Sequence, residues 1–141
     1  MAVAKEADLA VSAAPVSRRR SFAPRYPAWL TVPSLLLTTT GRKSGEKFIF
    51  PLFYGTDGDS YFVVASKGGA PQHPGWYRNI LANPEVEVQV GTAKMKARAR
   101  TTTGAERAAL WQKALEFWPP YADYQLKTER EIPVVVLDPV Q

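Results

Sequence analysis

The chain has 141 residues, 45% of them hydrophobic, and a formal net charge of +5. That length suits one domain with a substantial core, and the charge favours an acidic partner such as nucleic acid, anionic lipid or a polyanionic cofactor. The sequence contains no cysteine, which excludes disulfides, thiolate metal sites and cysteine nucleophiles, and its single histidine, His73, excludes a multi-histidine metal centre.

Residues 1–24 are rich in Ala and Ser and include three consecutive arginines, Arg18 to Arg20. No apolar period is sustained there, so we expect a flexible basic arm before a domain that spans residues 25–141. The arginines indicate either a solvated tail or peripheral contact with an anionic membrane. Charged residues interrupt any secretory apolar region, and no apolar run reaches the ~20 residues that span a bilayer, so we expect a cytoplasmic protein.

Six short apolar stretches predict strands because they alternate or are rich in β-branched and aromatic residues. Pro51 removes a ladder donor from the second, which indicates an edge, a bulge or a place where a ligand meets the backbone. Residues 55–59 predict a hairpin turn with Asp57 and Gly58 at its tip. The last stretch is hydrophobic throughout and should be central. The predicted strands span residues 34–40, 47–54, 60–65, 85–90, 94–100 and 132–137.

Helical spacing predicts a short helix over residues 73–82, with four apolar side chains on one face: Trp76, Tyr77, Ile80 and Leu81. A second helix runs from a capping box, in which Thr103 and Glu106 satisfy each other's backbone N–H groups, to about Trp118. Residues 121–125 can form one further turn. The order of these elements favours a mainly β (α+β) fold, a small Greek-key or split barrel with helices at its ends.

Two glycine loops follow predicted strands, Gly41–Gly45 (GRKSG) and Ser66–Ala70 (SKGGA). Each combines glycines, which let backbone N–H groups approach a ligand, with a cation and a serine hydroxyl. That chemistry suits an anion. We interpret the loops as opposite walls of one phosphate-bearing cofactor site, and the alternative is a pair of solvated turns.

Other motifs accompany these loops: Pro51-Leu52 with Tyr54, Pro74-x-Trp76-Tyr77-x-Asn79, Tyr121-x-x-Tyr124-Gln125, Thr128-x-Arg130 and Ile132-Pro133. Together, from about residue 34 to 139, they resemble the deazaflavin-dependent nitroreductase family. The resemblance implies a split β-barrel of the flavin-reductase or FMN-binding type, with about six antiparallel strands and two to three short helices. It also implies coenzyme F420, an 8-hydroxy-5-deazaflavin with a phosphate and an acidic glutamyl tail, and hydride transfer to a quinone, nitroaromatic or similar electrophile.

The resemblance assigns roles to particular residues. It places cofactor-binding residues in both loops, the second strand and the first helix: Arg42, Lys43, Ser44, Pro51, Leu52, Tyr54, Ser66, Lys67, Gly68, Gly69 and Trp76. It makes Tyr121, Tyr124 and Ser66 the catalytic candidates, as donors to the acceptor oxygen that gains charge. Core packing is the alternative for the two tyrosines and for Trp76.

Two positions depart from the family pattern. Phe48 stands where an arginine is usual, three residues before Pro51, and Lys47 should face the opposite side of the strand. Trp118 stands where a tyrosine is frequent, which predicts a more apolar substrate pocket. The departures keep two alternatives open, an FMN-using or non-catalytic ligand-binding protein of the same fold and, more remotely, a basic barrel that binds nucleic acid.

Overall fold

The computed structural model describes residues 32–140 of the chain. Its strands are β1 (Ser34–Thr40), β2 (Lys47–Phe53), β3 (Gly55–Asp57), β4 (Ser60–Val64), β5 (Glu85–Val90), β6 (Ala93–Thr101) and β7 (Val134–Pro139). Its helical elements are the short turn η2 (Lys67–Gly69), α3 (Gly75–Ala82), α4 (Gly104–Phe117) and α5 (Pro120–Leu126). The arm predicted for residues 1–24 and the first residues of the predicted domain lie outside the described residues.

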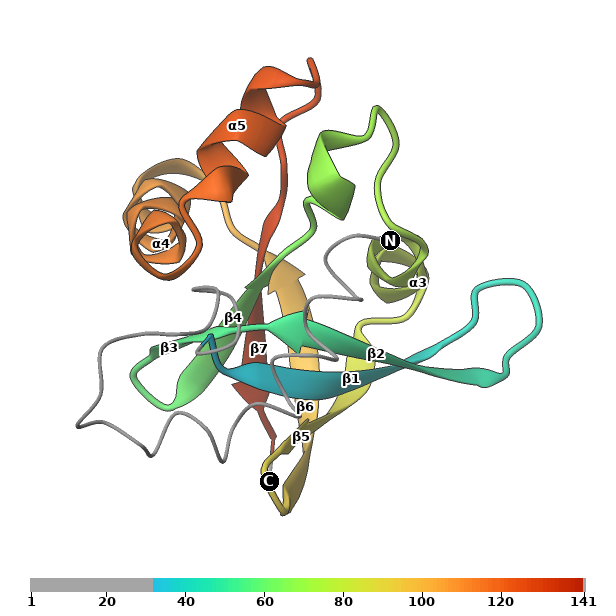
Figure 1. Cartoon of the computed structure of the whole chain (residues 1–141). Helices are drawn as coiled ribbons and strands as arrows, with labels where there is room; N and C mark the ends of the chain where they lie inside the picture. The colour runs from blue at the N-terminus through green and yellow to red at the C-terminus, as the bar shows by residue number, and fades with distance from the viewer. Residues whose placement is uncertain (1–31, 141) are drawn as a thin grey trace, which may run out of the picture.

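All seven strands pair antiparallel in one sheet, in the order β2-β1-β5-β6-β7-β4-β3. The sheet curves into a half-barrel (Figure 1). Strand β2 is an edge, which confirms the prediction from Pro51, and Pro51 lies opposite Leu36 of β1. Strand β7 lies between β6 and β4, so the all-apolar last strand is central, as its composition predicts.

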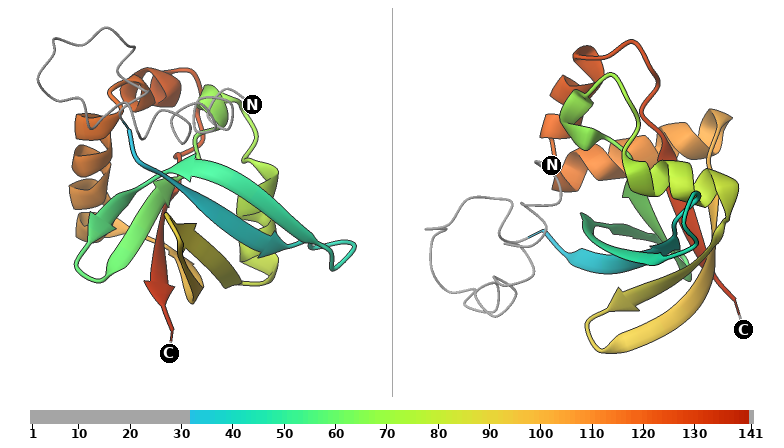
Figure 2. Two further views of the ribbon diagram at one scale, coloured as in Figure 1. Left: turned by 60° about the horizontal axis from the view of Figure 1, so that its bottom comes forward. Right: turned by 90° about the vertical axis from the view of Figure 1, so that its right-hand side faces the viewer.

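Alternation along the central strands buries both faces of the sheet. In β7, Val135 and Leu137 join one apolar cluster, while Val134 and Val136 join the other. Helix α3 packs on the first cluster, and helices α4 and α5 pack on the second. In Figure 1 and in the right-hand view of Figure 2 the three helices lie together above the strands of the half-barrel. The hairpin between β1 and β2 projects beyond them, so its glycine loop is reachable from solvent.

One predicted connection is a strand in part. The sequence predicts a turn over residues 55–59. In the structure Gly55–Asp57 is the short strand β3, and only Gly58 and Asp59 form the turn. Three residues without a large apolar side chain give no strand pattern in the sequence. They form β3 by pairing antiparallel with β4, where Thr56 lies opposite Tyr61. The sheet therefore has seven strands where about six were predicted.

Two details of the predicted helices are wrong. Thr103 does precede α4, but it makes no side-chain capping hydrogen bond. The carboxylate of Glu106, predicted to accept from the Thr103 N–H, instead binds the guanidinium of Arg100 at 2.8 and 3.0 Å. On α3, Leu81 is 61% exposed, whereas Asn79 is buried with Trp76 and Ile80. Within residues 32–140, no helix is long and apolar enough to cross a membrane.

Candidate functional site

The first glycine loop is a tight hairpin between β1 and β2. The backbone N–H of Gly41 donates to the carbonyl of Glu46 at 2.7 Å, and that of Gly45 donates to the carbonyl of Gly41 at 2.9 Å. Gly45 has φ +76°, in the region that favours glycine. Ser44 Oγ accepts from the Glu46 N–H at 3.1 Å, which leaves the hydroxyl hydrogen able to donate elsewhere.

A buried amide on α3 fixes the arginine of this loop. Asn79 Oδ1 accepts from the backbone N–H of Arg42 at 3.2 Å and from its Nη1 at 2.8 Å. Asn79 Nδ2 donates to the buried Thr39 Oγ1 at 3.0 Å. Asn79 belongs to one of the sequence motifs, but the motif assigns it no role. The signal that could have found it is a polar residue among the apolar positions of a short helix.

A cavity of about 270 Å³ lies beside this loop. Its lining is cationic on the loop side and aromatic on the β2 side, and consists of Gly41, Arg42, Lys43, Ser44, Phe48, Phe50, Gly75 and Asn79. The ring of Phe48 packs against Gly41 so closely that a Cβ on Gly41 would lie 2.6 Å from the Phe48 Cε2 atom. The structure therefore brings three predicted tail-binding residues, Arg42, Lys43 and Ser44, to one cavity, and makes Phe48 its wall.

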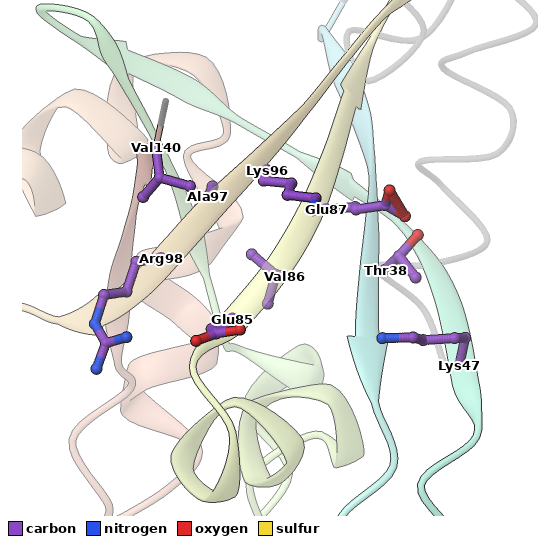
Figure 3. A pocket seen from close by; sticks show the side chains of 9 residues that line it. All are labelled: Thr38, Lys47, Glu85, Val86, Glu87, Lys96, Ala97, Arg98 and Val140. Carbon is purple, nitrogen blue, oxygen red and sulfur yellow. The ribbon is translucent and has the colours of Figure 1, made fainter.

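Lys47 does not take the place of the missing arginine. Its ammonium group donates to Thr40 Oγ1 at 2.9 Å, and its side chain lines a different hollow, together with residues of β1, β5 and β6. Figure 3 shows Lys47 extending from β2 toward β1 there. The hollow, of about 370 Å³, mixes both charges: Thr38, Lys47, Glu85, Val86, Glu87, Lys96, Ala97, Arg98 and Val140. The cations of residues 94–100 thus share their face with carboxylates, which argues against an anion groove.

The second glycine loop follows β4 and has an unusual backbone. Lys67, Gly68 and Gly69 have φ values of +48°, +64° and +85°. The amide of Gly69 donates to the Ser66 carbonyl at 2.9 Å, and that of Ala70 to the Lys67 carbonyl at 3.1 Å. Two of the amides are thus used within the loop, so the N–H groups of Lys67 and Gly68 are the better candidates for a ligand anion.

The loop also packs closely on α5. A Cβ on Gly69 would lie 2.6 Å from the carbonyl oxygen of Tyr124, so glycine is required both by its φ and by this contact. Ser66, at the start of the loop, is fully buried, and its Oγ has no hydrogen-bond partner among the described residues. A buried hydroxyl without a partner is unfavourable unless a ligand or water satisfies it, so Ser66 stays a predicted site residue that could bond a polar ligand group.

Arg130 ties this loop to the end of α5. Its guanidinium donates to the carbonyls of Ala65, Ser66 and Ala70 and to Nδ1 of His73. Since arginine only donates, the His73 Nδ1 accepts, and the ring is neutral with its hydrogen on Nε2. Burial, and then the charges of Arg130 and Arg78, lower the pKa of His73. Burial also lowers the pKa of Arg130.

Three of the predicted cofactor-binding residues belong to the apolar core or pack against it. Leu52 and Trp76 are buried in the first core cluster, and Tyr54 packs against it. Burial, with a contribution from Tyr61, raises the pKa of Tyr54, so its hydroxyl keeps its proton at neutral pH. Pro51 lies between Phe50 and Leu52 on the strand, and its ring therefore faces the opposite side of β2.

The two candidate tyrosines differ in burial. Tyr121 is 1% exposed, and its ring contacts those of Trp111, Phe117 and Tyr124. Tyr124 is half-buried and packs against both core clusters, and Trp118 Nε1 donates to its hydroxyl at 3.4 Å. Core packing accounts for the position of Tyr121, and the catalytic role of both side chains stays a prediction.

The described residues form two groups. Arg42, Lys43 and Ser44 share the first cavity with α3, whereas the loop of residues 66–70 packs on α5 and is held by Arg130. That cavity is not lined by residues 66–70, and the idea that the loops are opposite walls of one site stays a prediction. No cluster of three or more His, Asp or Glu side chains that could hold a metal occurs among the residues described.

The antiparallel half-barrel, with its helices on one side and two glycine loops at its strand ends, defines a split β-barrel of the flavin-reductase type. The same fold occurs in the heme storage protein HutZ from Vibrio cholerae, with a TM-score of 0.61 and 17% identity over 79% of this chain and 84% of that one. The sequence profile of the F420H(2)-dependent quinone reductase family matches residues 15–139. The chain belongs to that family.

Two closer relatives agree with this assignment. The F420H(2)-dependent quinone reductase Rv1261c of Mycobacterium tuberculosis (strain H37Rv) is 47% identical over 108 residues, which cover 74% of this chain and 72% of the relative. A solved structure described as the F420-H2 dependent reductase FDR-A has a TM-score of 0.71 and 48% identity, covering 75% of this chain and 94% of that one. These matches confirm the family and fold that the sequence motifs predict.

Proposed function

We propose that this protein is an F420H2-dependent reductase that passes a hydride from the reduced deazaflavin to a quinone or a similar electrophile. The observation that carries the proposal is the cavity beside residues 41–44, where Arg42 and Lys43 face the aromatic rings of Phe48 and Phe50. The two cations suit the anionic tail of the cofactor, and Phe50 leads along β2 toward Leu52 and Tyr54, the apolar residues proposed for its flat tricyclic ring.

The residues present fit such a group. Arg42 offers a planar fork and Lys43 a point charge, which together suit phosphate and carboxylate oxygens. The buried Ser66 hydroxyl, without a partner among residues 32–140, offers a hydrogen bond deeper in the protein. The half-buried Tyr54, which packs on the cluster that contains Leu52 and Trp76, provides apolar surface for a ring.

Each group then has a physical task. Arg42, held by Asn79, and Lys43 neutralise the tail, and Lys67 adds charge from the second loop. When bound, the reduced cofactor supplies a hydride, and the quinone becomes a hydroquinone after it also takes up one proton. The hydroxyls of Ser66 and Tyr124 donate hydrogen bonds to the oxygen that gains charge, and the apolar surroundings strengthen those bonds by excluding water.

Titration of the full-length protein with F420, FMN and an oligonucleotide tests the proposal. We expect micromolar or tighter binding of F420 alone, and reduction of menadione with F420H2 as the donor. Preferred binding of FMN, or absence of turnover, would contradict it and favour an FMN-using or non-catalytic protein of the same fold. Preferred binding of the oligonucleotide would favour the nucleic-acid alternative.

Two matched variants test the placement of the tail. Lys43→Ala and Lys67→Ala should each weaken F420 binding by about 1–3 kcal/mol if they contact the phosphate. Lys94→Ala, at the start of β6, is the control of equal charge change and should leave the affinity unaltered. Equal affinities in all three variants would remove the site assignment.

A further inference from the structure

Arg130 lies in the segment between α5 and β7, and its side chain donates hydrogen bonds to the loop of residues 65–70 and to the nearby His73. Nε donates to the carbonyl of Ala70 at 2.9 Å, and Nη2 donates to that of Ser66 at 2.7 Å. Nη1 donates to the carbonyl of Ala65 at 3.2 Å and to Nδ1 of His73 at 3.0 Å. A guanidinium presents five N–H donors in a rigid plane, so most of the donors of Arg130 are occupied here.

The loop that Arg130 holds has a backbone that needs support. Lys67, Gly68 and Gly69 are consecutive left-handed residues, and Lys67 is the one non-glycine residue with positive φ among those described. A side chain makes that conformation unfavourable, and such strain persists only where the surroundings over-determine it. Arg130 binds the carbonyls of Ser66 and Ala70, which flank the left-handed run, so its rigid fork fixes the separation of the two ends.

Arg130 is also a positive charge that no carboxylate neutralises in the described part of the chain, because none of the ion pairs there includes it. Its partners are carbonyl oxygens and a neutral imidazole. The charge lies directly beside the loop that carries Lys67, so an anion bound at this loop meets two cations. Both the hydrogen bonds and the positive charge of Arg130 therefore act on the loop of residues 66–70.

We propose that Arg130 is a positioning residue for the cofactor: it holds residues 66–70 in the shape that presents Lys67 and the Ser66 hydroxyl to F420. The cofactor half of this inference rests on the proposed function. The structural half, that Arg130 holds the loop, is independent of it and can be measured in the protein without cofactor.

The test uses full-length protein and three variants. Arg130→Met removes the donors and keeps the bulk, Arg130→Lys keeps the charge but not the planar fork, and Arg107→Met is the control. Arg107 is also half-buried and also donates to a carbonyl, that of Ile132 at 2.6 Å, but it lies on α4 and does not contact the loop. Amide hydrogen exchange over residues 66–70 is measured without cofactor, and the affinity for F420 is measured by fluorescence titration.

We expect Arg130→Met and Arg130→Lys to raise exchange in the loop at least tenfold and to weaken F420 binding at least tenfold. Arg107→Met should change neither by more than twofold. If Arg130→Met does not fold, Arg130→Lys decides alone.

Three results overturn the proposal: unchanged exchange in the Arg130 variants, faster exchange with unchanged affinity, or wild-type behaviour of Arg130→Lys in both measurements. A wild-type protein that does not bind F420 overturns the proposed function and the cofactor half together. The exchange data still decide separately whether Arg130 holds the loop.

Discussion

The side-chain oxygen of Asn79 accepts two hydrogen bonds from Arg42, one from its backbone N–H at 3.2 Å and one from its guanidinium at 2.8 Å. The nitrogen of the same amide donates to Thr39 Oγ1, and both Asn79 and Thr39 are buried. One amide therefore joins α3 to the end of β1 and to the first glycine loop. The position of the arginine that should hold the cofactor tail depends on a helix that follows the other glycine loop in the chain.

The variant Asn79→Ala tests this connection. It leaves the buried Thr39 hydroxyl without its partner and leaves the Arg42 guanidinium with only its long hydrogen bond to the Gly75 carbonyl, at 3.5 Å, so the free energy of unfolding should fall by about 1–3 kcal/mol. Affinity for F420 should fall by roughly tenfold, because the arginine must then be ordered on binding. Urea denaturation and fluorescence titration measure the two effects.

Asn83→Ala is the matched control for Asn79→Ala. Asn83 ends the same helix, and its exposed Oδ1 accepts from the Glu85 N–H at 3.2 Å. Its loss should cost less than about 1 kcal/mol and should not change the affinity. Equal losses of affinity in the two variants would mean that Asn79 does not position Arg42.

Local patterns predict the strands well, and three of the six strand pairings in the sheet are hairpins between consecutive strands. The alternation of Val86 and Val88 with exposed glutamates predicts β5, and the observed burial follows it. The apolar run that ends at Leu137 predicts a strand buried on both faces, and β7 is one. In each case the pattern of a few adjacent residues decides the structure.

The predictions are wrong or incomplete where a residue distant in the sequence determines the local structure. Glu106 could have bonded the N–H of Thr103, but Arg100, projecting from β6, offers it two charge-assisted hydrogen bonds. Asn79 is buried in place of Leu81 because its partners are on β1 and in the first loop, and no helical period contains that information. Arg130 had no visible role in the sequence, since the carbonyls that it binds are about 60 residues earlier.

Ser66→Ala should separate stability from function. The Ser66 hydroxyl is buried without a partner in the described structure, so its removal should leave the free energy of unfolding unchanged or raise it by up to about 1 kcal/mol. Affinity for F420 or turnover should nevertheless fall, because a ligand that satisfies the hydroxyl loses a hydrogen bond. Thermal unfolding and steady-state kinetics with menadione measure the two effects.

Thr102→Val is the contrasting control. Thr102 is 2% exposed, and its hydroxyl donates to the carbonyl of Val134 at 2.8 Å. Valine keeps the shape and removes the bond, which should lower the free energy of unfolding by about 1–2 kcal/mol without affecting cofactor affinity. A Ser66→Ala protein that loses stability as Thr102→Val does would show that the hydroxyl has a structural partner.

The protonation of His73 should make stability depend on pH. Its Nδ1 accepts from Arg130, and burial with the charges of Arg130 and Arg78 lowers its pKa below the ordinary value of 6.5. As the pH falls through 6.5, the unfolded chain binds the proton first, while the folded protein binds it only at the lower pKa. The free energy of unfolding should therefore decrease as the pH falls across this interval and then level off.

The chain has one histidine, so its contribution can be isolated. Urea denaturation from about pH 7.5 to about pH 5 should show the decrease in the wild-type protein, and His73→Gln should remove it. The hydrogen bonds from Arg100 lower the pKa of Glu106, and the hydrogen bonds from Ser60 and Arg100 lower the pKa of Asp138 although burial raises it, but carboxylates titrate at more acidic pH. The same slope in His73→Gln and in the wild type would assign the effect to other groups.

Phe48 and Ile49 provide a pair of adjacent test sites on opposite faces of β2. Phe48 lines the cavity with Arg42 and Lys43 and is 42% exposed, whereas Ile49 is 63% exposed and does not line it. Phe48→Arg adds a third cation to the predicted tail site, so F420 should bind roughly tenfold more tightly, with a stronger dependence on salt. Ile49→Arg adds the same charge on the other face and should change the affinity by less than about twofold. Titrations at low and high ionic strength compare the two, and an equal gain in both variants would mean that net charge, and not the cavity, attracts the cofactor.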